Sequence, residues 1–127
     1  MTFFEGIGMH AGYGASMILN GCSISVDKGQ IAVIVGPNGA GKSTAMKALF
    51  GMLPLREGSV FSDGRDITQL RPEQRVLLGM GYVPQTNNVF PSMTVLENLE
   101  MGGFVRRDDL SQTISEIFDL FPILQYV

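Results

Sequence analysis

The chain has 127 residues, of which 45% are hydrophobic and 17% charged, a composition typical of one globular domain or part of one. The net charge of −3 and the isoelectric point near 5.0 exclude an extended basic surface that would bind nucleic acid. The single cysteine, Cys22, cannot form an internal disulfide and indicates a reducing compartment. No apolar run approaches the ~20 residues of a membrane-spanning helix, and no secretory leader is expected at the N-terminus.

The first third of the chain predicts strands followed by one helix. Residues 1–30 read as short strands broken by glycine, a pattern that favours antiparallel pairing. Residues 31–35 are apolar at every position, which predicts a strand covered on both faces, as in an α/β sheet. A helix is expected after Lys42, over residues 45–50, and should end near Gly51, with Pro54 just beyond its end.

The middle of the chain predicts a hairpin, a short helix and another buried strand. Residues 58–67 read as a β-hairpin that turns at an Asp-Gly pair. A helix over about 72–78 is expected because Pro72 suits a first helical turn. Residues 80–84 resemble a second buried strand.

The last third predicts two helices. Thr94 and Glu97 form a capping box that opens a helix to about Met101. Asp109 opens another helix by similar capping. One face of this second helix is apolar and is expected to pack in the core: Leu110, Ile114, Ile117, Phe118 and Phe121.

Residues 36–44 satisfy the phosphate-loop pattern G-x-x-x-x-G-K-[ST], between the predicted strand and helix. Gly36, Gly39 and Gly41 allow backbone conformations in which several N–H groups converge on phosphate oxygens. The helix that follows adds its free N–H groups and the positive end of its dipole. Lys42 is placed to reach the β- and γ-phosphates, and the Ser43 hydroxyl to coordinate Mg²⁺. The sequence therefore predicts a nucleotide-phosphate site; the alternative is a glycine-rich turn ahead of a helix.

This loop, Gly-Pro-Asn-Gly-Ala-Gly-Lys-Ser-Thr, is similar to the Walker A loop of ATP-binding-cassette (ABC) ATPases, and three other features agree in order and spacing. Tyr13 precedes the loop where that family has an aromatic residue that stacks on adenine. Gln85 follows a Gly-Tyr-Val-Pro segment, as does the family's Q-loop glutamine, which reaches the metal and the attacking water. Residues 90–99 resemble the family's entry into its helical subdomain.

The resemblance implies ATP and Mg²⁺ as cofactors. Gln85 would serve catalysis, and Ser43 and Gln85 would contact the metal. Without the resemblance, Tyr13 could be an ordinary aromatic at a strand end and Gln85 a solvated loop amide. The residues that would bind the nucleotide are Tyr13, Gly36, Asn38, Gly39, Ala40, Gly41, Lys42, Ser43 and Thr44.

Within the family, residues 93–103 and 120–122 resemble the subgroup that energises branched-chain amino acid import, whose relatives serve urea and similar small polar solutes. The resemblance covers the whole chain but only the first half of such a domain. The implied fold class is α/β, an incomplete P-loop NTPase (ABC ATPase) fold. Its expected parts are an antiparallel β subdomain (about 1–30 and 58–68), a P-loop core (31–57 and 69–85) and the start of a helical subdomain (86–127).

The same resemblance implies partners and a location. The subunit would pair head to tail with a second ATP-binding subunit, identical or related, beneath two transmembrane permease subunits. It would be cytoplasmic and peripheral on the inner face of the cell membrane. Gln85 and the loop over residues 86–88 would pass closure of the pair to the permease.

Three motifs of the family have no counterpart here: the Walker B strand with its Asp-Glu, the Leu-Ser-Gly-Gly-Gln signature and the switch histidine. In the family all three come after the point where this sequence stops, and His10 lies far too early to be the switch histidine. By itself the chain is expected to bind ATP weakly, to hydrolyse it negligibly, and to leave the strands at 31–35 and 80–84 without neighbours. Two other classes remain: a regulatory nucleotide-binding module that never hydrolyses ATP, and a small P-loop kinase. Small P-loop kinases usually carry a basic lid with several arginines. The kinase is disfavoured because Arg106-Arg107, interpreted as a solvated loop, is the only adjacent basic pair.

Overall fold

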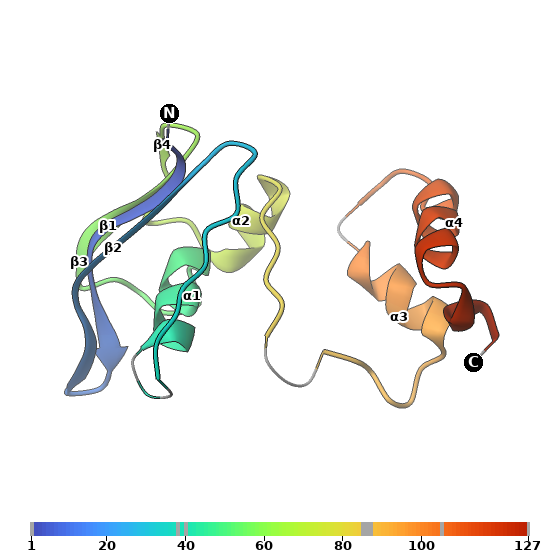
Figure 1. Cartoon of the computed structure of the whole chain (residues 1–127), viewed down its shortest axis with the longest axis horizontal. Coiled ribbons are helices and arrows are strands. Elements are labelled where there is room, and N and C mark those ends of the chain that lie inside the picture. The colour runs from blue at the N-terminus through green and yellow to red at the C-terminus, as the bar shows by residue number, and fades with distance from the viewer. Residues whose placement is uncertain (1, 38, 40, 85–87, 105, 127) are drawn as a thin grey trace. The chain divides into compact units, whose positions relative to one another are not determined.

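The computed structural model describes residues 2–37, 39, 41–84, 88–104 and 106–126. By their internal contacts these residues form two units, one ending at Tyr82 and one beginning at Val83 (Figure 1). Each is described by itself. Among the described residues, no helix is both long enough and apolar enough to cross a membrane.

The first unit is built on one antiparallel sheet in the order β2-β1-β3-β4. Its strands are β1 (Thr2–Tyr13), β2 (Ser16–Asp27), β3 (Glu57–Ser62) and β4 (Arg65–Asp66). The antiparallel pairing predicted for the N-terminal residues is confirmed, but two strands of 12 residues replace the expected short ones. The glycines do not break these strands, because the β1–β2 register shifts at several irregularities and thereby accommodates them.

The turn between β3 and β4 lies at the predicted Asp-Gly pair. Asp63 has φ of 50° and Gly64 has φ of 80°, the left-handed conformations that a tight hairpin turn favours. Beyond β4, the Asp66 carboxylate accepts hydrogen bonds from the Thr68 hydroxyl (2.6 Å) and backbone N–H (2.9 Å). These bonds lower the pKa of Asp66 and fix the chain where it leaves the hairpin.

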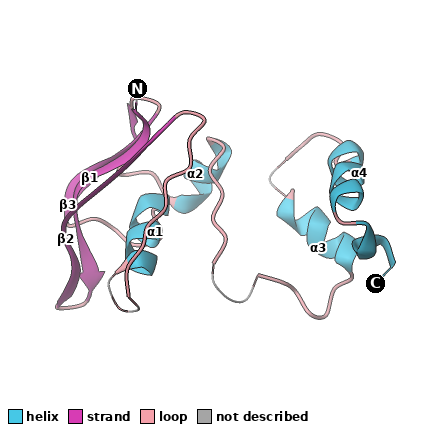
Figure 2. Ribbon diagram, in the orientation of Figure 1, coloured by secondary structure: helices cyan, strands magenta, loops and turns pink. Residues whose placement is uncertain are grey.

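Helix α1 (Lys42–Phe50) supplies the apolar layer against the sheet, as Figures 1 and 2 show. Its buried side chains recur three and four residues apart, the spacing of one helix face. The core that they form with the sheet consists of Met9, Ala11, Leu19, Ala45, Ala48, Leu49, Val60 and Ile67. The helix ends at Gly51 as predicted: Gly51 has φ of 87°, and the N–H groups of Gly51 and Met52 bond the carbonyls of Ala48 and Lys47.

Helix α2 (Pro72–Leu77) begins at the predicted proline and carries the buried cation Arg75. Arg75 is 2% exposed, and its guanidinium donates to the carbonyl oxygens of Leu49 (2.7 Å), Leu70 (3.0 Å) and Thr68 (3.1 Å). Burial lowers its pKa from the ordinary value, although a guanidinium stays charged at neutral pH. Because Leu49 lies in the last turn of α1, the cation also meets the negative end of that helix.

Two predicted strands are not formed. Residues 31–35 and 80–84 adopt no regular structure, and Figure 2 draws both as loop. Ile31 is 92% exposed, Val35 84% and Val83 82%. The physical reason is that a strand of a parallel sheet exists only through its hydrogen-bonded neighbours, and no strand in the described part of the chain pairs with either segment.

The second unit consists of α3 (Val95–Gly102), α4 (Ser111–Leu120) and a short 3₁₀ helix, η1 (Pro122–Tyr126). The capping box predicted for α3 is confirmed: the Thr94 hydroxyl accepts from the Glu97 N–H (3.1 Å), and the Glu97 carboxylate accepts from the Thr94 N–H (2.9 Å). The bond from the Thr94 backbone N–H to the carboxylate lowers the pKa of Glu97. At α4, Asp109 accepts from the Ser111 N–H (2.9 Å), but the residue at the N-cap position is Leu110.

The apolar face of α4 is not the buried core that the sequence predicted. None of the residues of α4 is buried, and beyond its end Phe121 is 58% exposed. Two short helices and one 3₁₀ turn have too little surface to enclose an apolar face of this width. The prediction of the helix was therefore right, and the prediction of its burial was wrong.

We expect Arg75→Met to lower the free energy of unfolding by about 2–4 kcal/mol, because the substitution leaves one buried and two partly buried carbonyl oxygens without their donor. Urea unfolding followed by circular dichroism measures this loss. Arg65→Met, at an exposed position of β4, is the matched control and should stay within about 0.5 kcal/mol of the parent. Equal effects of the two substitutions would contradict the role assigned to Arg75.

Hydrogen–deuterium exchange tests the two unformed strands. Amides of residues 31–35 should exchange close to the rate of an unstructured peptide, since no ladder protects them. Amides of residues 4–6 in β1, which are paired with both β2 and β3, serve as the internal reference and should exchange far more slowly. Comparable protection in the two segments would show a strand that the structure does not contain.

Candidate functional site

The phosphate-loop pattern falls at the N-terminus of α1. Gly39 and Gly41 have φ of 87° and 94°, so both take the left-handed conformation that the loop requires of glycine. Gly41 is the N-cap residue, and its carbonyl accepts the first helical bond from the Ala45 N–H (2.8 Å). The N–H groups ahead of Ala45 therefore have no helical acceptor and remain available to an anion.

The charge at this helix end is positive. Lys42, the first helical residue, donates from its Nζ to the Gly36 carbonyl, so its ammonium lies over the loop. In α1, all of which the structure describes, no acidic residue occupies the first turn. Ser43 is exposed, whereas Thr44 is 7% exposed and packs inward. Backbone donors, a helix dipole and an ammonium thus converge, an arrangement that can hold a polyanion.

Tyr13, the predicted adenine contact, is the last residue of β1 and pairs with Ser16, the first residue of β2. It is 48% exposed, and Gly14 beside it has φ of 59°. Strands β1 and β2 approach each other closely here: a Cβ at Gly12 would lie only 1.9 Å from the Ser16 carbonyl oxygen. This turn holds an exposed aromatic ring at one end of the sheet.

Strand β2 brings the Tyr13 turn and the glycine loop to the same end of the unit. A Cβ at Gly41 would lie 3.2 Å from Ile18 Cγ2, so the loop rests against the beginning of β2, a few residues from the turn. Figure 1 shows the β1–β2 turn and the loop before α1 at the same end of the first unit. Strand β2 thus connects Tyr13 with the glycine loop, although the two lie 23 or more residues apart in the sequence.

Three predicted site residues lie outside the described residues: Asn38, Ala40 and Gln85. Their roles stay predictions. Among the described residues, no group of three or more histidine, cysteine or acidic side chains gathers as a metal cluster. The described residue that could contact a metal beside a bound phosphate is Ser43.

No sequence pattern indicated Arg56, which the structure adds to this region. Arg56 immediately precedes β3, and its Nη2 donates to the carbonyl oxygen of Gly14 in the β1–β2 turn. The two residues are 42 positions apart. Only the pairing of β3 with β1 brings them together, so no local pattern could have predicted the contact.

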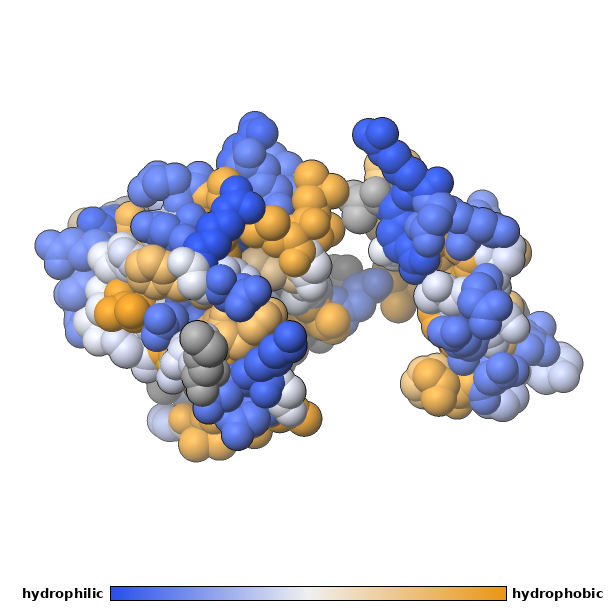
Figure 3. Space-filling model, turned by 90° about the horizontal axis from the view of Figure 1, so that it is seen from above, coloured by the Kyte–Doolittle hydropathy of each residue, from blue (hydrophilic) through white to orange (hydrophobic). Residues whose placement is uncertain are grey.

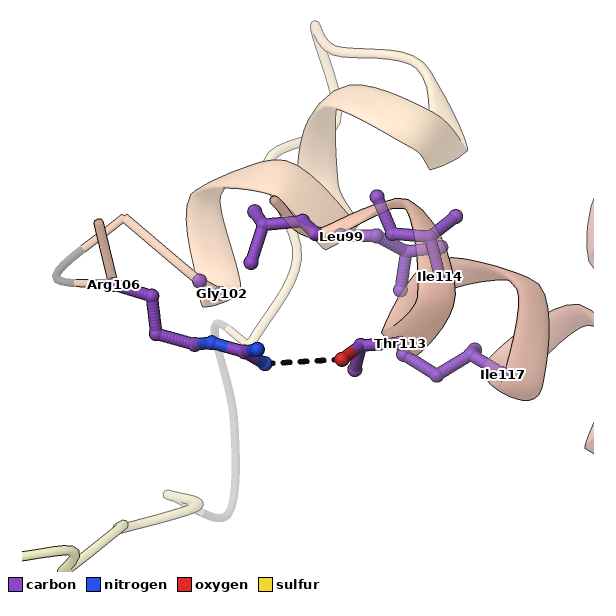
Figure 4. A pocket seen from close by; sticks show the side chains of 8 residues that line it. Leu99, Gly102, Arg106, Thr113, Ile114 and Ile117 are labelled. Carbon is purple, nitrogen blue, oxygen red and sulfur yellow. Dashed lines mark hydrogen bonds between the residues drawn. The ribbon is translucent and has the colours of Figure 1, made fainter. Parts of the chain in front are cut away.

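The structure also contains cavities that are lined mainly by apolar side chains. One of about 340 Å³ is lined by the unformed strand (Ile31, Ile34) and by residues of β1, β2 and α1. Another, of about 260 Å³, lies between α3 and α4, where Leu99 faces Ile114 (Figure 4). At its rim Arg106 bonds the Thr113 hydroxyl (3.1 Å) and pairs with Asp108, which lowers the pKa of that carboxyl. Figure 3 shows exposed apolar residues on both units.

A family model described as "ABC transporter" matches residues 19–125, which include the loop, α1, the hairpin and both later helices. Among curated relatives, the chain is 41% identical over 118 residues to the probable branched-chain amino acid transport ATP-binding protein LivF of Archaeoglobus fulgidus, covering 92% of this chain and 50% of that protein.

The chain is 36% identical to the high-affinity branched-chain amino acid transport ATP-binding protein BraG of Pseudomonas aeruginosa (89% of this chain, 49% of that protein). It is 35% identical to the molybdate/tungstate import ATP-binding protein WtpC of Thermococcus kodakarensis (84% and 31%). The chain spans about half the length of the two amino-acid transport relatives and less of the third.

A solved structure gives the same result for the fold. The crystal structure of a nucleotide-free ATP-binding cassette from an ABC transporter superposes with a TM-score of 0.76 at 36% identity, covering 86% of this chain and 43% of that one. The chain thus has part of the ABC ATPase fold, as the sequence predicted, with its antiparallel sheet and helices formed and two strands of the core unformed.

Proposed function

The chain belongs to the ABC transporter family, and on that premise we propose that it binds Mg-ATP as the nucleotide-binding part of an importer's ATPase subunit. The observation that carries the proposal is the N-terminus of α1. There Gly39 and Gly41 take the left-handed conformation, and Lys42 lies over the loop. A triphosphate needs converging N–H donors and a cation, and both are present.

The residues present fit ATP and Mg²⁺. The α1 N–H groups and Lys42 would hold the phosphates, and the exposed Ser43 hydroxyl would contact the metal. Bound Mg²⁺ would neutralise phosphate charge. Tyr13, exposed at the same end of the unit, would receive the adenine ring, whose flat face suits stacking.

For the transported solute we propose a branched-chain amino acid. In support, the relative of 41% identity and another of 36% identity carry that description. The third relative imports molybdate or tungstate by its description, so an oxyanion is the competing solute. The subunit would work with a second ATP-binding subunit and with membrane permease subunits, peripherally on the cytoplasmic side of the membrane.

Hydrolysis would need more than the described site provides. We propose that Gln85 positions the attacking water and contacts the metal, and that the Walker B and signature residues come from sequence beyond this chain. The exposed apolar side chains of Ile31, Val33, Val35 and Val83 support this proposal, because strands of a parallel core would cover them. A regulatory module that binds ATP without turnover remains the second candidate, favoured if the complete protein binds ATP and does not hydrolyse it.

The nucleotide site is tested by Lys42→Ala. The Kd for Mg-ATP, measured by isothermal titration calorimetry, should rise about 10- to 100-fold, since one charge-assisted contact to phosphate is lost. Lys47→Ala is the matched control: it removes the same charge from the last turn of the same helix and should leave the Kd within about twofold. Unchanged ATP binding by the Lys42 variant would exclude the proposed phosphate contact.

The solute is tested in the organism that carries the gene. Deleting the gene should abolish ATP-driven uptake of labelled leucine, isoleucine and valine, and leave uptake of molybdate intact. The parent gene should restore uptake, and the Lys42→Ala gene should not. Loss of molybdate uptake with normal leucine uptake would replace the proposed solute by the competing one.

A further inference from the structure

The turn that carries Tyr13 extends beyond the three-stranded part of the sheet. The pairing of β1 with β3 ends at His10, opposite Glu57. From there to Tyr13, β1 is paired with β2 alone, through the partners of Ala11, Gly12 and Tyr13. A two-stranded ribbon is only marginally stable in water, so a ring at its tip is held loosely unless something else fixes the turn.

Arg56 provides that fixation. Its backbone N–H donates to the His10 carbonyl (2.8 Å), where β3 begins to pair with β1. Its side chain then spans the two-stranded extension, and Nη2 donates to the Gly14 carbonyl at the turn. Arg56 is thus hydrogen-bonded at both ends of the two-stranded extension: at its base and at its tip. The tip residue, Gly14, directly follows Tyr13 in the sequence.

The contact is poorly explained as a contribution to stability alone. Arg56 is exposed, so its hydrogen bond forms in competition with water and contributes little to the folding of the whole unit. What the bond changes locally is the freedom of a turn whose Gly14 already takes a left-handed conformation (φ 59°). When the turn loses conformational freedom, Tyr13, which is 48% exposed, loses it as well.

We propose that Arg56 is a positioning residue for nucleotide binding: its bond to the turn presents the Tyr13 ring to the adenine base. The inference rests on the proposed function, because it presupposes a nucleotide bound at the N-terminus of α1. Arg56 acts through Tyr13 and not on the phosphates. Its effect is therefore confined to ligands that carry a base.

The test compares ATP with inorganic tripolyphosphate, which has the phosphates and no base. Arg56→Ala in the full chain should raise the Kd for ATP about three- to tenfold and leave the Kd for tripolyphosphate within about twofold. Arg56→Lys, which keeps one donor, should recover part of the loss. Arg65→Ala, an exposed arginine on β4, is the matched control and should change neither Kd.

A double-mutant cycle decides whether Arg56 works through Tyr13. In a Tyr13→Ala background, Arg56→Ala should change the Kd for ATP by less than about twofold, because the ring that the turn positions is gone. Additive losses would instead mean that Arg56 contacts the nucleotide directly and would overturn the inference. So would an equal loss for tripolyphosphate, or ATP binding that Arg56→Ala leaves unchanged.

The outcome for the parent chain separates this inference from the proposed function. A parent that binds neither ATP nor tripolyphosphate overturns both. A parent that binds both ligands, with an Arg56 variant that binds ATP equally well, overturns only the role of Arg56. If Arg56→Ala fails to fold by circular dichroism, Arg56→Lys carries the comparison, and an unchanged ratio of the two Kd values contradicts the proposal.

Discussion

The packing of α1 against the antiparallel sheet is the contact on which the first unit depends. Small and aliphatic residues one helical turn apart, Ala45, Ala48 and Leu49, are buried against the sheet and make up the helix's share of the core. Both ends of the helix are fixed as well. At the C-terminus Arg75 bonds the Leu49 carbonyl, and at the N-terminus Gly41 rests on the beginning of β2. A helix held at three places keeps its first turn in a constant position relative to the strands.

Under the proposed function, this constant position would let the N-terminus of α1 and the β1–β2 turn act as one nucleotide site. The loop offers N–H donors and Lys42, and the turn offers the half-exposed side chain of Tyr13. Strand β2 connects them, and the hydrogen bond from Arg56 limits the movement of the turn. The proposed division of work follows the chemistry: charge and backbone donors for the phosphates, and a flat aromatic surface for the base.

Features set by short-range chemistry could be predicted from the sequence. The capping box at Thr94 and the glycine end of α1 were both right, because each depends on residues within one turn. The strand at residues 31–35 was wrong, because an apolar run becomes a parallel strand only beside neighbours, which the described part of the chain lacks. The contact of Arg56 with Gly14, 42 residues away, and that of Arg75 with Leu49, 26 residues away, could not be predicted from any local pattern.

The most direct test of the account is a two-dimensional ¹⁵N NMR titration of the full chain with Mg-ATP. If the first turn of α1 and the Tyr13 turn form one nucleotide site, the amide signals of residues 41–44 and of Tyr13 and Gly14 should shift together, with those of α2 unchanged. Shifts at the loop alone would remove Tyr13 from the site, and no shift at residues 41–44 would contradict the account.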